Sequence, residues 1–218
     1  MTRSGSGPPD AVLIAEARAG SPTAREALFR RYAPLVNGLA YRLLGGDSDL
    51  DDLVQESFAQ ALTCLDRLQN TETFATWLST IVVRTCNKLL RRRRLMARFG
   101  LWRPPEIDWE QVRSHGASIE DLVELRAIYR LVHDMPSDLA VPLVLRHVED
   151  KSLQEIADLT GASIATVKRR ITKAQQRLEA ALREERDALP PQNSVRANEG
   201  TDDHHTPRVA NAGRRTDG

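Results

Sequence analysis

Residues 151–182 carry cationic side chains at a spacing that suits binding to duplex DNA. Ser152 and Glu155 form the pattern of a capping box at the start of a helix, and Gly161 ends that helix where a left-handed residue is usually needed. Ser163 can cap a second helix, whose outer face carries Thr166, Lys168, Arg169, Arg170 and Lys173. Such cations neutralise phosphates, and arginine forks donate hydrogen bonds to guanine edges. The segment therefore predicts a helix-turn-helix that binds DNA.

The inward residues of this segment support the same interpretation. Val167, Ile171, Ala174 and Leu178 recur at the three-to-four spacing of a helix with one buried face. Ala157 stands where two helices that cross at a short turn approach closely, so a small residue is expected there. The alternative is an ordinary solvated amphipathic helix. That alternative does not explain why the caps, the glycine, the small residue and the basic face coincide.

A second group of cations lies on a helix expected over residues 73–94, and every charged residue in 73–105 is basic. Single-stranded nucleic acid is bound by cations along its backbone together with aromatic rings on which bases stack. Trp77 is the aromatic candidate, although its spacing from Phe74 and Ile81 favours a place in the core. Nonspecific phosphate contacts are a compatible role for the run 91–94. The cations expected to follow a strand are Arg84, Lys88, Arg91 and Arg92.

An acidic surface is expected on the helix that begins near residue 49. Apolar residues of this helix can pack inward, while Asp49, Asp52 and Glu56 share its outer surface at helical spacing. Like charges on one face repel each other, so an arginine-rich partner would give this surface a purpose. The alternative is an ordinary solvated face near a helix N-terminus, where acids are favoured in any case.

Composition and charge suit a small helical protein that contacts nucleic acid in two places and a protein partner elsewhere. Apolar residues make up 41 % and aromatic residues 5 % of the 218 residues, which suits aliphatic helical cores. The net charge of +1 conceals acidic blocks that alternate with basic ones along the chain. No strand-like alternation appears. We predict two helical domains joined by a flexible linker, divided as a disordered leader 1–9, a first domain 10–96, a linker 97–117, a second domain 118–187 and a disordered tail 188–218.

The sequence contains no pattern typical of an enzyme. It has no glycine-rich phosphate loop, no spacing of a catalytic triad and no cluster of metal ligands, so we expect no catalysis, no cofactor and no metal. Cys64 and Cys86 form no disulfide framework and are expected to be small buried apolar residues. No apolar run is long enough for a membrane span, and the N-terminus lacks a hydrophobic signal core. We therefore expect a soluble, cytoplasmic protein.

Two segments in the same order resemble one family. DLDDLVQESFAQA, followed by FATWLSTIVVRTCNKLLRRRR, resembles the second conserved region of bacterial sigma factors. MPSDLAVPLVLRHVEDKSLQEIADLTGASIATVKRRITKAQQRL resembles their fourth region. The resemblance covers residues 10–95 and 118–185. The absence of regions one and three indicates the extracytoplasmic-function (ECF) group, whose members are alternative initiation factors that direct RNA polymerase to promoters.

The resemblance implies a docking site on core RNA polymerase and a site for the −10 element. The docking residues implied are Asp52, Leu53, Gln55 and Glu56. The −10 element would contact the helix that carries Trp77, Arg84, Lys88, Arg91 and Arg92, and family members capture a flipped base in the preceding loop, here residues 69–73. Many relatives have asparagine where this chain has Arg84, so the position is carried over without its base preference.

For the −35 element, the resemblance implies that the second helix of the helix-turn-helix enters the major groove. The candidates for base edges are Lys168, Arg169, Thr172 and Lys173, and those for phosphates are Thr166, Arg170 and Arg146. Relatives often have serine at position 169 and an aromatic residue or histidine at 172. We therefore expect this chain to recognise a different −35 sequence. The family also implies an anti-sigma partner and a monomer in the holoenzyme. The alternatives are a conventional helix-turn-helix regulator without polymerase and a helical interaction or enzyme domain with a basic surface.

Overall fold

The computed structural model describes residues 7–44, 49–101, 128, 131, 132 and 134–188. Every regular element in this part of the chain is helical, which confirms the predicted all-α fold. Residues 1–6 of the expected leader, 102–117 of the linker, the helix start expected at 118 and residues 189–218 of the tail lie outside the described residues. The elements are α1 (Asp10–Arg18), α2 (Pro22–Leu44), α3 (Leu50–Thr63), the 3-10 turns η1 (Leu65–Arg67) and η2 (Thr71–Thr73), α4 (Phe74–Arg98), α7 (Ser137–His147), α8 (Leu153–Thr160) and α9 (Ile164–Ala188).

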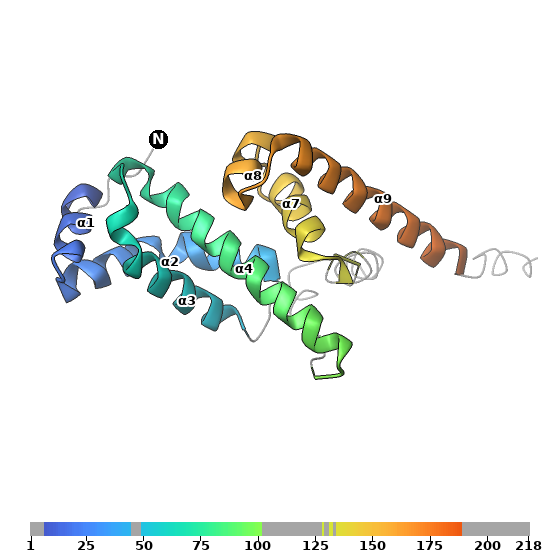
Figure 1. Ribbon diagram of the computed structural model, residues 1–218, viewed down its shortest axis with the longest axis horizontal. Coiled ribbons are helices and arrows are strands. Elements are labelled where there is room, and N and C mark those ends of the chain that lie inside the picture. The colour runs from blue at the N-terminus through green and yellow to red at the C-terminus, as the bar shows by residue number, and fades with distance from the viewer. Residues whose placement is uncertain (1–6, 45–48, 102–127, 129–130, 133, 189–218) are drawn as a thin grey trace, which may run out of the picture.

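The helices α1 to α4 form a bundle in which α4 packs against both α2 and α3 (Figure 1). The bundle is held by an aliphatic and aromatic core. Its members repeat at helical spacing along each element, and they include Leu28, Val36, Phe74, Leu78 and Val82, all of which are buried. Burial of such side chains contributes roughly 1.5–3 kcal/mol each before the cost of ordering the chain. This bundle fixes the faces of α3 and α4 that remain outside.

The helices α7, α8 and α9 form a second unit, in which α7 packs along α9 and α8 closes one end (Figure 1). A small apolar cluster between α7 and α9 contains Leu139, Leu143 and Ala174. Ile156 of α8 and Val167 of α9 belong instead to the large core that extends into the first bundle. The second unit is therefore not an isolated helix-turn-helix.

The two units are in contact, whereas the sequence suggested separate modules. α4 packs against α7 and α8 as well as against its own bundle (Figure 1). Around its buried stripe α4 keeps the partly buried residues Trp77, Ile81 and Leu89, so its apolar surface is wide enough to serve both sides. An ion pair between Arg42 of α2 and Glu149, just after α7, joins the same two units. The contact arises from residues far apart in sequence, which periodicity alone does not reveal.

The described helices differ in how their ends are capped. The capping box of Ser152 and Glu155 is formed in both directions, and Gly161 is left-handed with φ 68°. The Ser21 and Ser163 hydroxyls accept hydrogen bonds from Ala24 N–H at 3.3 Å and Thr166 N–H at 3.2 Å, as expected of caps.

Asp10, Asp49 and Thr73 do not cap their helices, because each side chain is used elsewhere. Asp10 accepts from Arg31 and Tyr32, Asp49 accepts from Arg93, and the Thr73 hydroxyl donates to the Asn70 carbonyl.

Candidate nucleic-acid and polymerase interfaces

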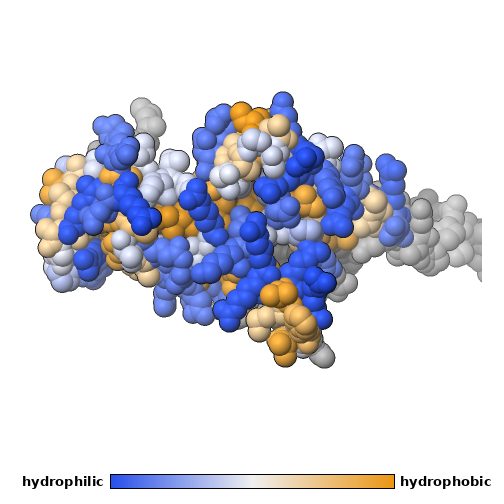
Figure 2. Space-filling model, viewed as in Figure 1, coloured by the Kyte–Doolittle hydropathy of each residue, from blue (hydrophilic) through white to orange (hydrophobic). Residues whose placement is uncertain are grey.

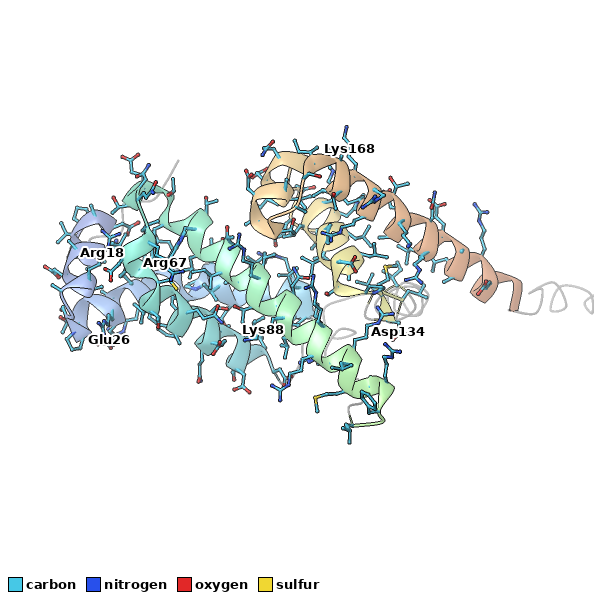
Figure 3. All side chains as sticks on the ribbon, in the orientation of Figure 1. Arg18, Glu26, Arg67, Lys88, Asp134 and Lys168 are labelled. Atoms are coloured by element: carbon cyan, nitrogen blue, oxygen red, sulfur yellow. The ribbon has the colours of Figure 1, made fainter. Side chains whose placement is uncertain are left out.

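The outer face of α9 carries a group of polar and cationic side chains. Lys168, Arg169, Thr172 and Lys173 are exposed, and none forms an ion pair with a described residue. Lys168 points away from the body of the protein at the end of α9 near α8 (Figure 3). The four candidates for base contacts are therefore brought together on one face with their donors available. We call this set the α9 surface.

The three residues expected to hold phosphates are engaged within the protein. Arg170 is partly buried and lies 3.7 Å from the Asp138 carboxylate of α7. The Thr166 hydroxyl is 2.9 Å from that of Ser163, and Arg146 donates to the Lys151 carbonyl at 2.9 Å. Arg146 remains exposed and retains free donors in its guanidinium. Arg170 is held in place by α7, so its first role is to attach the recognition helix to the fold.

The start of α8 is strengthened by a charged cap. Glu155 accepts from Ser152 N–H at 2.8 Å, and its own N–H donates to the Ser152 hydroxyl at 3.2 Å. The pKa of Glu155 is lowered, mainly by the hydrogen bond with the Ser152 side chain and next by that with the Ser152 backbone. The carboxylate therefore stays ionised at neutral pH and favours the helix N-terminus. This local order fixes the start of α8, where the chain turns from α7 into the helix-turn-helix.

The cations of α4 are exposed but divided. Lys88, Arg91 and Arg92 extend from the helix into solvent, as the sequence predicted. Arg93 is different: it is 4 % exposed, and its guanidinium bonds the Asp49 carboxylate at 2.5 and 3.0 Å. The sequence offered no signal for this, because the pair is separated by 44 residues and Asp49 was assigned to the outer acidic surface. Arg93 therefore stabilises the fold, whereas Arg91 and Arg92 are exposed and can contact a ligand.

Figure 2 shows a largely hydrophilic face with an apolar group at the far end of α4. Leu95, Phe99 and Leu101 are exposed there. The cations of α4 are therefore bordered by apolar side chains at the C-terminal end of the helix.

The N-terminal half of α4 is only partly available. The Trp77 ring is half-buried, with its centroid 5.8 Å from that of Phe74, so it packs with the core as its spacing suggested. Arg84 is exposed, yet its Nη2 lies 3.6 Å from the position that a Cβ on Gly161 would occupy. Arg84 therefore lies beside the turn of the helix-turn-helix. In this arrangement the second unit covers part of the face expected to receive the −10 element.

The exposed ridge of α3 contains three of the four docking candidates. Asp52, Gln55 and Glu56 are exposed, and Glu56 accepts a hydrogen bond from Gln60 at 2.6 Å. Leu53 does not belong to this surface. It is 2 % exposed and packs in the core, because it projects from the side of α3 that faces the bundle. A direct contact of Leu53 with a partner is therefore excluded in this conformation, and we call the remaining three residues the α3 ridge.

Other kinds of site are not found in the part of the chain that the structure describes. Within it, no three His, Cys, Asp or Glu side chains gather as metal ligands would. None of the described helices combines the length and the apolar character that crossing a membrane requires. Cys86 is buried, as expected for a small apolar residue, whereas Cys64 is only half-buried.

A helix-turn-helix with an exposed cationic helix, packed beside a bundle with a second cationic helix, defines a DNA-binding protein of two helical units. The family described as Sigma-70 region 2 matches residues 28–95, and the family described as Sigma-70, region 4, matches residues 125–178. The first match spans α3 and α4, and the second spans α7, α8 and most of α9.

Two bacterial proteins are similar to this chain over most of their length. The chain is 30 % identical to the ECF RNA polymerase sigma-E factor of Salmonella typhimurium and 29 % identical to that of Escherichia coli. Each match covers 78 % of this chain and 92 % of the relative. The chain belongs to the ECF group of the sigma-70 family, and it directs transcription initiation.

Solved structures agree on the fold. CnrH in complex with the cytosolic domain of CnrY matches with a TM-score of 0.53 and 23 % identity, covering 81 % of this chain and 98 % of that one. The sigma factor RpoE in complex with the anti-sigma factor NepR from Bartonella quintana matches with a TM-score of 0.53 and 21 % identity, covering 72 % and 96 %.

Proposed function

We propose that this chain binds core RNA polymerase through the α3 ridge and recognises promoters through α4 and the α9 surface. In this role it acts in the cytoplasm as a single copy within the holoenzyme, and it catalyses no reaction itself. The polymerase supplies the chemistry of nucleotide addition. The observation that carries the proposal is the presence, in one sigma-family chain, of an exposed acidic ridge and two exposed cationic helices.

The α3 ridge is suited to a basic partner. Asp52 and Glu56 lie one helical turn apart and add to the acids at the start of α3, so they leave a concentrated negative charge that no described cation neutralises. A complementary arginine-rich surface would relieve this repulsion and steer association. Gln55 lies between them and can donate or accept at the same surface.

The α9 surface is suited to duplex DNA at the −35 element. Lys168 and Arg169 can reach guanine O6 and N7, and Thr172 can contact a base edge or a thymine methyl group. Lys173 lies one turn further on and can do the same or hold a phosphate. Helix-turn-helix proteins place the N-terminal part of their second helix in the major groove, which is the part of α9 where these residues lie.

The −10 element is assigned to α4 and to the loop before it. Arg84, Lys88, Arg91 and Arg92 supply charge for the backbone of an opened strand. Elements named −10 and −35 lie about 25 base pairs apart, which is roughly 85 Å of B-DNA. Because α4 contacts α8 here, the two DNA surfaces are much closer than that. We therefore propose that the two units separate when polymerase and promoter are bound.

A protein inhibitor is also part of the proposal. Both solved neighbours are complexes, one of them with a protein named as an anti-sigma factor. An anti-sigma partner of this chain would act by covering the α3 ridge or by holding the two units together. Either action would block polymerase or prevent the span between promoter elements.

The test is run-off transcription with purified core polymerase on a pool of promoter fragments. The chain should produce specific transcripts, whereas a variant with Asp52→Ala, Gln55→Ala and Glu56→Ala should bind polymerase roughly a hundredfold more weakly. A matched control is Glu16→Ala with Glu26→Ala, which removes exposed acids from the same bundle outside the ridge. Equal loss in both variants would count against the docking surface.

The competing function is a conventional helix-turn-helix regulator. It predicts tight binding of the isolated chain to duplex DNA and no specific transcript with core polymerase. That result would leave the α9 surface as the functional site and remove the role of the α3 ridge.

A further inference from the structure

The loop between α3 and α4 has a defined backbone that includes the two 3-10 turns η1 and η2. It leaves the bundle after Leu68 and re-enters at Phe74, and both of these residues are buried. Between these anchors, Gln69, Asn70, Glu72 and Thr73 are exposed. The loop therefore presents polar side chains to solvent from a fixed base, beside the start of α4.

Arg18, the last residue of α1, holds the base of this loop. Its Nε and Nη2 donate to the Leu65 carbonyl at 3.2 and 3.0 Å, and Nη2 also donates to the Leu68 carbonyl at 2.5 Å. Figure 3 shows Arg18 between α1 and the η1 turn. Its side chain is 31 % exposed, and the Asp66 carboxylate 3.9 Å away is largely in solvent. The carbonyl contacts, rather than that weak ion pair, are the main interaction.

The chemistry of these carbonyls explains why an arginine is there. The Leu65 carbonyl accepts from Leu68 N–H at 3.1 Å, and Leu68 follows the turn η1, so Arg18 supplies further donors to two backbone carbonyls of the loop. A guanidinium can bridge two acceptors with a planar fork of donors, and its hydrogen bonds are charge-assisted. A lysine ammonium is a point charge and cannot reproduce this geometry.

The other end of the loop is fixed by its own side chains. The Asn70 Oδ1 accepts from Glu72 N–H at 2.9 Å, and the Thr73 hydroxyl donates to the Asn70 carbonyl at 2.8 Å. These bonds close η2 and begin α4, but they do not connect the loop to the bundle. Within the part of the chain that the structure describes, only Arg18 ties the backbone of this loop to another helix through hydrogen bonds.

We propose that Arg18 is a positioning residue for promoter opening, which holds the loop 68–73 in the shape that captures an unstacked −10 base. The inference rests on the proposed function and adds a residue outside the region-2 match, which begins at residue 28. Arg18 touches no DNA in this role. It acts through the Leu65 and Leu68 carbonyls, because a base pocket requires its walls to stay within a fraction of an ångström of the productive geometry.

The experiment transcribes two promoter pools with core polymerase and saturating wild-type or variant chain, one randomised at the −10 element and one at the −35 element. The readout is the ratio of the most to the least favoured base at each position. For Arg18→Ala we expect this ratio to fall roughly tenfold at one or two −10 positions, a loss typical of one stacked base. The −35 ratios should be unchanged. Arg18→Lys should show the same selective fall, although a smaller one.

The control is Arg67→Ala, which removes an exposed cation from the same loop and leaves the contacts to the Leu65 and Leu68 carbonyls in place. It should lower total transcript without changing the −10 ratios. Thermal melting and co-purification with polymerase verify that each variant folds and docks, and if Arg18→Ala fails to fold, Arg18→Lys decides.

Unchanged −10 ratios in the folded variants, or an equal fall at −10 and −35, would overturn the role of Arg18. A wild-type chain that shows no promoter preference would instead refute the proposed function itself.

Discussion

The two cationic helices, α4 and α9, differ in how much of their surface the fold leaves free. α9 is held from one side by α7 and α8, and its base-contact candidates all face solvent. α4 is packed by its own bundle on one side and by α7 and α8 on another. The comparison indicates that the α9 surface is already formed in this conformation, whereas the surface of α4 becomes fully available only when the two units separate.

Each helix also uses one arginine of its cationic set for folding. Arg93 of α4 pairs with Asp49, and Arg170 of α9 pairs with Asp138. Burial distinguishes the two pairs, because the Arg93 side chain is 5 % exposed and that of Arg170 is 27 % exposed. A count of basic residues would therefore overestimate the number of cations that α4 and α9 can offer to DNA. Of the two paired arginines, Arg93 of α4 is the more deeply buried. The following predictions test this distinction.

The largest effect is expected at Arg93. Arg93→Ala should lower the free energy of unfolding by roughly 2 kcal/mol, since it removes a buried packed side chain and leaves Asp49 without this cation. The partner is 37 % exposed, so the loss stays below that of a fully buried pair. Chemical denaturation followed by circular dichroism measures it.

The matched variant, Arg92→Ala, removes the neighbouring exposed cation and should change stability by less than about 0.5 kcal/mol. A similar loss of stability in both variants would show that Arg93 contributes no more to the fold than its exposed neighbour.

The next effect concerns base readout by α9. Lys168→Ala and Arg169→Ala should each change the preference among −35 sequences by about 1–3 kcal/mol if the side chain reads a base. Arg170→Ala serves as the comparison, because its guanidinium is directed to Asp138 and it should reduce stability rather than preference. Competition binding of holoenzyme to promoter fragments with single −35 substitutions measures both. A uniform loss across all fragments would make the residue a phosphate contact.

Substitution of two glycines, one beside each helix, tests the same comparison with a smaller expected effect. Gly161, before α9, and Gly100, after α4, both have φ 68°, a left-handed conformation that alanine adopts at a cost of about 1 kcal/mol. Gly161→Ala should also weaken −35 binding, because it disturbs the turn that sets α8 against α9. Gly100→Ala should cost similar local strain and leave −35 binding intact, as nothing lies within 4 Å of its Cβ position. Fragment binding and thermal melting, measured together, distinguish the two.

The features predictable from sequence are those built from neighbouring residues. The capping box of Ser152 and Glu155, the left-handed Gly161 and the stripe of α9 depend on spacings of three or four residues, so periodicity was sufficient. The same spacing predicts the outward position of Asp52 and Glu56, whereas Leu53, which the family resemblance implies as a docking residue, belongs to the buried stripe of α3.

What the sequence did not reveal depends on contacts between distant residues. Arg93 meets Asp49 across 44 residues, and Arg18 meets the loop across 47 to 50. The packing of α4 against α8 joins elements from the two matched regions. Such contacts are selected by the three-dimensional arrangement, so a spacing rule along one helix cannot predict them.

The smallest expected effect tests the contact between the units directly. Arg42 and Glu149 have side chains that are 40 % and 13 % exposed, and an ion pair of this kind contributes at most about 1 kcal/mol, less at high salt. Arg42→Glu should therefore shift the free chain only modestly toward separated units, as measured by small-angle scattering or by the distance between dyes on α2 and α9. Arg30→Glu, which breaks a pair within α2, should not.

The double reversal, Arg42→Glu with Glu149→Arg, should restore the compact form, because the attraction is regained with its sign exchanged. If the single reversal changes nothing, the apolar contact between α4 and α8 holds the units without help from this pair. If the double reversal fails to restore compaction, Arg42 acts through packing rather than charge. Only restored compaction shows that the charge of this ion pair helps to hold the units together. The contact between the units then weakens as ionic strength rises. Salt would therefore expose more of α4, whereas the α9 surface is already exposed.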